Sequence, residues 1–101
     1  MNIEKINDVV KKVWGRTFKA LEKGNNEYEL VHTIGLNGAV GSARGRFEVK
    51  DNTFKVRHVW ASHGHAFAGQ VRRLGYIPKV YEEPVEGDTA WNWTVVEFAA
   101  E

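Results

Sequence analysis

Residues 41–60 read GSARGRFEVKDNTFKVRHVW, and this stretch decides the fold class. Apolar and charged residues alternate on both sides of Asp51-Asn52, a pattern typical of two half-buried strands joined by a two-residue turn. The apolar members of the pattern are Phe47, Val49, Phe54, Val56 and Trp60, and His58, opposite Gly45, falls on the same face. Because side chains alternate between the faces of a strand, we expect these residues to point toward the core.

The other face of this predicted hairpin carries like charges. With Asp51-Asn52 as the turn, Arg46 lies opposite Arg57 and Arg44 lies diagonally, with Lys50 and Lys55 nearby. Like charges directly across an antiparallel pair are destabilising, so this face needs a source of negative charge. Either a nearby carboxylate of the chain or an anionic partner would supply that charge.

The remaining elements follow from hydrophobic periodicity. Residues 2–23 are expected to form one amphipathic helix, capped by Asn2, ended by Gly24-Asn25-Asn26 and weakened at Gly15. Residues 27–35 alternate as a strand, and the glycine-rich stretch 35–41 is read as a connector without the Lys-Ser/Thr of a phosphate-binding loop.

The C-terminal half repeats the alternation of helix and strand. Residues 62–75 are expected to form a second helix with Ser62 as its cap, Gly75 as its left-handed end and Pro78 beyond. Residues 79–83 and 89–98 then read as two strands around a turn. The sequence therefore predicts a single α+β domain over residues 1–101, in the order α-β-β-β-α-β-β. We expect an antiparallel sheet of four to five strands with two helices packed on one face.

Composition excludes several classes of protein. The chain has no cysteine, so disulfide frameworks and thiol chemistry are excluded, which is consistent with a cytoplasmic location. No apolar run is long enough to span a membrane, and residues 1–10 do not resemble a secretion signal. The net charge of +1 conceals an uneven distribution: residues 1–81 carry fourteen Lys/Arg against seven Asp/Glu, whereas residues 82–101 carry six acids and no base.

The basic residues are the strongest functional signal. Phosphate is the commonest multivalent anion that such a surface meets, so we expect a non-enzymatic module that binds RNA or DNA. The predicted nucleic-acid-binding residues are Arg44, Arg46, Arg57, Lys50, Lys55, Arg72 and Arg73. Aromatic rings would add stacking surfaces, but Trp91 and Trp93, which share one strand face, are expected to lie in the core.

A second hypothesis uses both charged halves of the sequence. A small regulatory or inhibitory protein could bind another protein through its basic and acidic surfaces. The predicted interaction residues are then Glu82, Glu83, Glu86 and Asp88. The sequence leaves the oligomeric state open.

The histidines do not form a recognisable metal or catalytic motif. His58, His63 and His65 lie within eight residues, with His32 elsewhere, but their spacing matches no familiar ligand pattern. No carboxylate lies beside them in the sequence to orient the rings, and no Ser-His-Asp set follows from spacing. We therefore predict no metal, no cofactor and no catalytic residue.

Two resemblances concern the order of elements. EYELV after a first helix, followed by a three-stranded meander and a second helix, resembles the double-stranded RNA-binding domain over residues 3–75. The chain departs from that family in having SHGHAFAGQ where the family carries a lysine cluster. QVRRLGYIPKVYEE leading into AWNWTV resembles the recognition helix and wing of winged-helix proteins, but the helix that precedes these elements in that family is missing here. Neither resemblance assigns a role to a residue of this chain.

Overall fold

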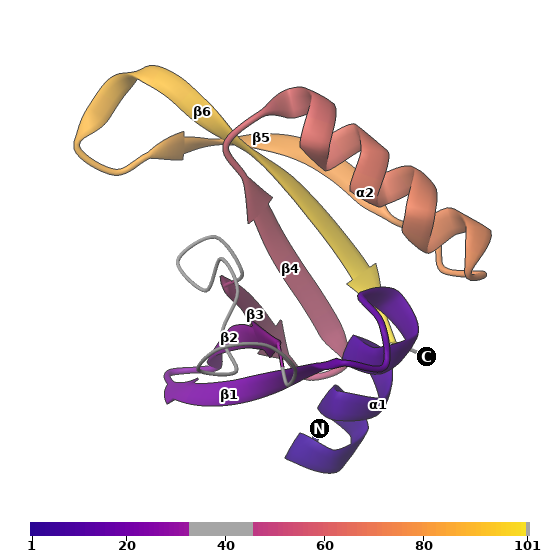
Figure 1. Ribbon diagram of the computed structural model, residues 1–101. Helices are drawn as coiled ribbons and strands as arrows, with labels where there is room; N and C mark the ends of the chain where they lie inside the picture. Colours follow the sequence, from indigo (N-terminus) through magenta and orange to yellow (C-terminus); the bar gives the residue numbers. More distant parts are fainter. Residues whose placement is uncertain (33–45, 101) are drawn as a thin grey trace. The chain divides into compact units, whose positions relative to one another are not determined.

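The chain forms two helices and six strands in the residues that the computed structural model describes, 1–32 and 46–100 (Figure 1). The elements are α1 (Ile3–Val13), β1 (Phe18–Gly24), β2 (Glu27–His32), β3 (Arg46–Lys50), β4 (Thr53–His58), α2 (Ala61–Arg73), β5 (Lys79–Val85) and β6 (Asp88–Ala99). The α+β class with antiparallel strands is confirmed. The described strands number six rather than the expected four to five, and four of them precede α2.

The chain divides into a first unit, residues 1–52, and a second unit, residues 53–101. Each unit contains one helix and three strands, in the order β1-β2-β3 in the first and β4-β6-β5 in the second. We predicted a single domain with both helices on one face of the sheet. Both parts of that prediction depend on how the two units are arranged, and they stay predictions. Neither helix is long and apolar enough to cross a membrane, as judged over the described residues.

The first helix is shorter than expected, and this accounts for the additional strand. Asn2 caps α1 as predicted, with its Oδ1 accepting from the backbone N–H of Lys5 at 2.9 Å. However, α1 ends at Val13, and Gly15 has a φ of +131°, a conformation incompatible with a continuing helix. The prediction of one helix over residues 2–23 is therefore wrong, because residues 18–24 form β1 instead.

A tight turn connects β1 to β2. Asn25 and Asn26 have φ values of 53° and 65°, the left-handed geometry that favours the right-handed twist of a hairpin. The residues expected to end a helix thus end a strand.

The side chain of Asn7 on α1 accepts from the backbone N–H of Ala20 at 2.7 Å, which joins the helix to β1. Phe47 on β3 stacks between Trp14 and Tyr28, with ring centroids 5.3 and 5.7 Å away.

The alternation across residues 46–58 is confirmed by burial. Phe47, Val49, Phe54 and Val56 are buried, whereas Arg46 and Lys50 are exposed. Trp60 departs from the pattern: β4 ends at His58, and Trp60 becomes the N-cap residue of α2 with 64% of its surface exposed. The expectations that Trp60 points to the core and that Ser62 caps the helix are therefore wrong.

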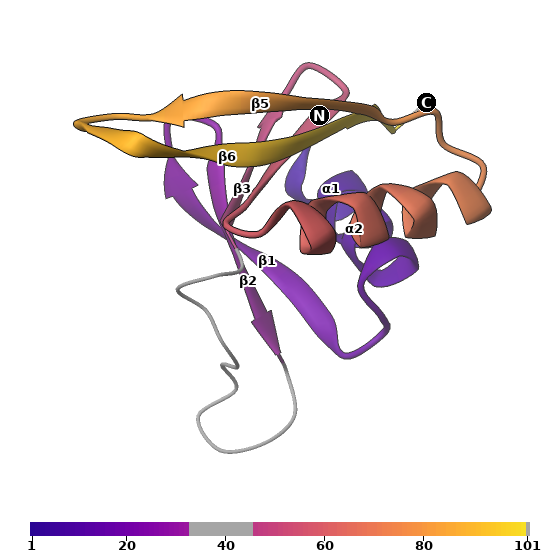
Figure 2. The same ribbon diagram turned by 90° about the horizontal axis from the view of Figure 1, so that it is seen from above.

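One face of the β4-β6-β5 sheet is covered by α2 (Figure 2). Phe54 and Phe98 stack across the strands with centroids 5.2 Å apart, and Phe67 and Tyr76 pack on Phe98 at 6.1 and 5.0 Å. The helix ends as predicted at Gly75, whose φ is +99°, and the N–H of Tyr76 returns to the carbonyl of Val71 at 3.0 Å.

Candidate nucleic-acid interface

The functional candidates of the second unit gather on the sheet face opposite α2. The register places Lys55 beside Glu97, Arg57 beside Val95 and Glu83 beside Trp93. Directly paired residues share a face of an antiparallel sheet, so these rows define one surface. We call it the charged face; it consists of Lys55, Arg57, Tyr81, Glu83, Trp93 and Glu97.

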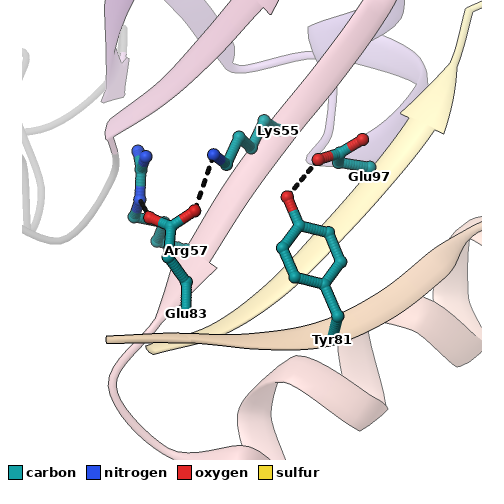
Figure 3. A network of polar contacts seen from close by, with 5 residues as sticks. All are labelled: Lys55, Arg57, Tyr81, Glu83 and Glu97. Atoms are coloured by element: carbon teal, nitrogen blue, oxygen red, sulfur yellow. Dashed lines mark hydrogen bonds and ion pairs between the residues drawn. The ribbon is translucent and has the colours of Figure 1, made fainter. Parts of the chain in front are cut away.

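Glu83 joins the two cations of β4. Its Oε2 lies 2.7 Å from the Nζ of Lys55, and its Oε1 accepts from the Nε of Arg57 at 2.7 Å (Figure 3). The hydrogen bond from Lys55, reinforced by Arg57, lowers the pKa of Glu83 despite its partial burial. The three side chains keep 26%, 29% and 27% of their surface exposed, so solutes reach the cluster.

This cluster shows where Lys55 and Arg57, two of the like-charged residues of the stretch 41–60, find negative charge. The chain supplies its own carboxylate to Lys55 and Arg57, from a strand 26 residues after Arg57. The acidic C-terminal segment therefore folds back onto basic residues. By unit, the charges nearly balance: the first unit carries nine Lys/Arg against seven Asp/Glu, a net of +2, and the second five against six, a net of −1. Neither unit therefore carries the +7 or −6 of the two sequence segments.

A second polar contact lies in the same face. The hydroxyl of Tyr81 donates to Oε2 of Glu97, and Figure 3 shows the ring directed toward that carboxylate. Burial, and then the hydrogen bond to Glu97, raise the pKa of Tyr81. The Nζ of Lys79 lies 5.9 Å from the centroid of the Tyr81 ring. Tyr81 is thus held as a neutral hydrogen-bond donor.

Two tryptophans lie at one end of the charged face. Trp91 and Trp93 make an edge-to-face contact, with centroids 5.0 Å apart and an interplanar angle of 70°. Trp91 is 37% exposed and Trp93 is partly exposed, so the expectation that both lie in the core is wrong. The physical reason is that the regular pairing of β5 with β6 shifts after Pro84, near the hairpin turn, where α2 and the apolar core do not extend.

The predicted basic residues fall into separate groups. Arg46 and Lys50 belong to β3 in the first unit, and both are exposed; Arg46 lies opposite Glu29 on β2. Arg72 and Arg73 are exposed on α2, on the other side of the β4-β6-β5 sheet from Lys55 and Arg57. The pairing of Arg46 with Arg57 joins residues of different units and stays a prediction. Arg44 lies outside the described residues, as does the whole connector 35–41.

The predicted acidic residues also separate. Glu82 pairs with Thr94 on the face toward α2 and is exposed, whereas Glu83 is engaged on the charged face. Glu86 is exposed at the turn, and Asp88 begins β6. Glu82 and Glu83 therefore lie on opposite faces of the sheet.

The histidines do not gather into a metal site. Within residues 1–32 and 46–100, no group of three or more His, Asp or Glu side chains could hold an ion. His58 instead packs against Phe67, with centroids 5.2 Å apart, and its Nδ1 is a buried atom without a hydrogen-bond partner in this part of the chain. Burial lowers the pKa of His58. His63 and His65 are exposed on α2.

The sequence left open whether a carboxylate of the chain neutralises the basic residues, but it did not single out Glu83, and it missed the exposure of the tryptophans. The signal for the cluster was present in the alternation of β5, where Tyr81 and Glu83 share one face, and of β6, where Trp93 and Glu97 do. Placing β6 between β4 and β5 would have brought Glu83 to Arg57. Sequence order alone does not indicate which strand is central.

Comparison with known proteins adds no relative to this description. No protein-family model matches the chain, and neither the curated proteins nor the solved structures yield a match. The double-stranded RNA-binding domain places three strands between its helices, whereas the described residues of this chain already place four there.

Proposed function

We propose that this chain is a non-enzymatic module that binds single-stranded nucleic acid on the charged face of its second unit. The observation that carries the proposal is the position of Trp93, with Trp91 packed against it, on the same sheet face as Lys55 and Arg57. Proteins that bind single strands combine cations for the phosphates with aromatic rings for the bases. The charged face carries both cations and aromatic rings on neighbouring strands.

Each residue type has a distinct task in this proposal. Lys55 and Arg57 contact phosphate oxygens, Arg57 through a guanidinium that suits them geometrically. Trp91 presents a ring to a base, and its edge-to-face contact with Trp93 holds that ring in place. Arg46 and Lys50 on the first unit and Arg72 and Arg73 on α2 would extend the electrostatic attraction without belonging to the same face.

Fluorescence anisotropy with a labelled single-stranded RNA of about 12 nucleotides tests the proposal, since small binding domains cover strands of this size. At about 50 mM salt we expect saturable binding that weakens steeply as salt is raised. Trp91→Ala should weaken binding roughly 5- to 100-fold, because stacking on one ring is worth about 1–3 kcal/mol per base. The matched control is Trp60→Ala, which removes an exposed tryptophan outside the charged face. Absence of binding by the wild-type protein, or equal losses in both variants, contradicts the proposal.

A second candidate function is a regulatory protein that binds another protein. Trp, Tyr and Arg dominate the energetics of protein interfaces, and the charged face contains all three. Exposed Glu82 and Glu86 would then contribute to the interface. Replacing both with glutamine should weaken a protein complex without weakening nucleic-acid binding, whereas Arg57→Glu should weaken either kind of complex.

A further inference from the structure

Two cations share one carboxylate on the charged face. Lys55 and Arg57 occupy alternate positions of β4, a strand paired without interruption to β6 from Thr53 to His58. Glu83 places one oxygen 2.7 Å from each of them. The cations thus converge on a group with two oxygens and a single negative charge. A phosphodiester presents the same pattern, two non-bridging oxygens that share one charge.

The carboxylate and the two cations come from different strands. β5 lies at one end of the order β4-β6-β5, and its register shifts between Pro84 and Val85, after the residue that follows Glu83. Pro84 has no N–H with which to continue a ladder. Glu83 pairs regularly with Trp93, one pair before the shift, and its side chain reaches Lys55 and Arg57 on a different strand. Glu83 can leave the cluster without disturbing β4.

The contact is also accessible. About a quarter of each of the three side chains is exposed, and ion pairs of that exposure exchange with solvent and with other ions. When the Glu83 side chain rotates away, water solvates its carboxylate, and an external anion can take its place beside Lys55 and Arg57.

We infer that Glu83 is an internal competitor that occupies the phosphate-binding position of Lys55 and Arg57 until a nucleic-acid strand displaces it. This inference rests on the proposed function and adds its regulation. A binding site that is available only part of the time has an affinity reduced by that fraction. If Glu83 fills the position about nine-tenths of the time, the apparent affinity for the strand is reduced roughly tenfold.

Three variants separate the position of the carboxylate from its charge. Glu83→Gln removes the competing anion, and Glu83→Asp keeps the charge but shortens the side chain by one methylene, so that it no longer reaches both cations. Glu82→Gln is the matched control, because it removes one negative charge from the adjacent residue, whose partner is Thr94 on the other face. Circular dichroism at the assay temperature establishes that each variant is folded.

Anisotropy titrations with the labelled 12-nucleotide RNA, and with DNA of the same sequence, give the result. We expect Glu83→Gln to bind about tenfold tighter than the wild type, Glu83→Asp several-fold tighter and Glu82→Gln less than about threefold tighter. The inference is overturned if Glu83→Gln and Glu82→Gln have equal effects, or if neither Glu83 variant binds more tightly than the wild type. In either case, binding by the wild type still upholds the proposed function. Failure of the wild type and of every variant to bind overturns both the inference and the proposed function.

Discussion

Replacement of Gly64 by alanine tests how α2 is seated on its sheet. A Cβ on Gly64 would lie 2.5 Å from Cγ2 of Thr94 and 3.1 Å from its Cβ, distances that require something to move. Thr94 is only 5% exposed, so its side chain has little space to yield. His58 Nδ1, 3.6 Å from the same point, closes a further direction.

The magnitude follows from two opposing effects. Alanine gains about 1 kcal/mol over glycine in a helix interior, whereas overpacking of a buried contact costs about 1–3 kcal/mol. We expect Gly64→Ala to lower the free energy of unfolding by about 1–2 kcal/mol. Gly69→Ala is the control in the same helix, because its Cβ would meet only the end of Arg73 at 3.7 Å. That variant should gain up to about 1 kcal/mol.

Urea unfolding followed by circular dichroism measures both variants. Thr94→Ser removes Cγ2, the atom nearest to the added Cβ. In the Thr94→Ser background, Gly64→Ala should therefore lower the free energy of unfolding by about 1 kcal/mol less than it does in the wild type, or less still. If Gly64→Ala proves as stable as Gly69→Ala, or if Thr94→Ser leaves its cost unchanged, the close contact between α2 and β6 is refuted.

Three further perturbations test the polar contacts. The folded state lowers the pKa of His58 below its ordinary value of 6.5, so the unfolded chain takes up the proton at a higher pH than the folded chain does. The free energy of unfolding should therefore fall as the pH drops below about 6.5. His58→Gln should remove that part of the pH dependence in urea titrations. The folded state lowers the pKa of Glu83 below its ordinary value of 4.5, so the stability that this residue contributes is present above pH 4.5 and is lost below it. In an acid titration, Glu83→Gln should lose stability less steeply than the wild type. Equal slopes would contradict the ion cluster. Asn7→Ala leaves the N–H of Ala20 without its acceptor and should cost about 1–2 kcal/mol of unfolding free energy, measured by denaturant titration, whereas an unchanged midpoint would exclude that hydrogen bond.

Local patterns predicted those features of the fold that depend on neighbouring residues. Alternation around Asp51-Asn52 identified β3 and β4, and the Gly75 signal identified the end of α2, because turns and caps are set by backbone preferences that the sequence displays directly. The failure at residues 18–24 has a similar cause. Apolar residues spaced three to five apart fit a helix as well as a strand, and only the conformation of Gly15 decides between them.

The site was harder to predict because it depends on strand order. Lys55 and Arg57 were recognised from their sequence pattern, but their carboxylate partner lies on a strand that reaches them only across β6. The exposure of Trp91 also depends on tertiary structure, since aromatic content favours the core and only the end of the regular pairing after Pro84 places the ring outside it.

Nuclear magnetic resonance of the indole N–H groups tests the central claim most directly. The chain has four tryptophans, so a ¹H–¹⁵N correlation spectrum contains four indole signals, assignable by single replacement. During titration with single-stranded RNA we predict that the signals of Trp91 and Trp93 shift together and saturably, while the signal of Trp14, stacked on Phe47 in the first unit, remains in place. Shifts confined to Trp14 or Trp60, or no shift at saturating RNA, would contradict binding on the charged face.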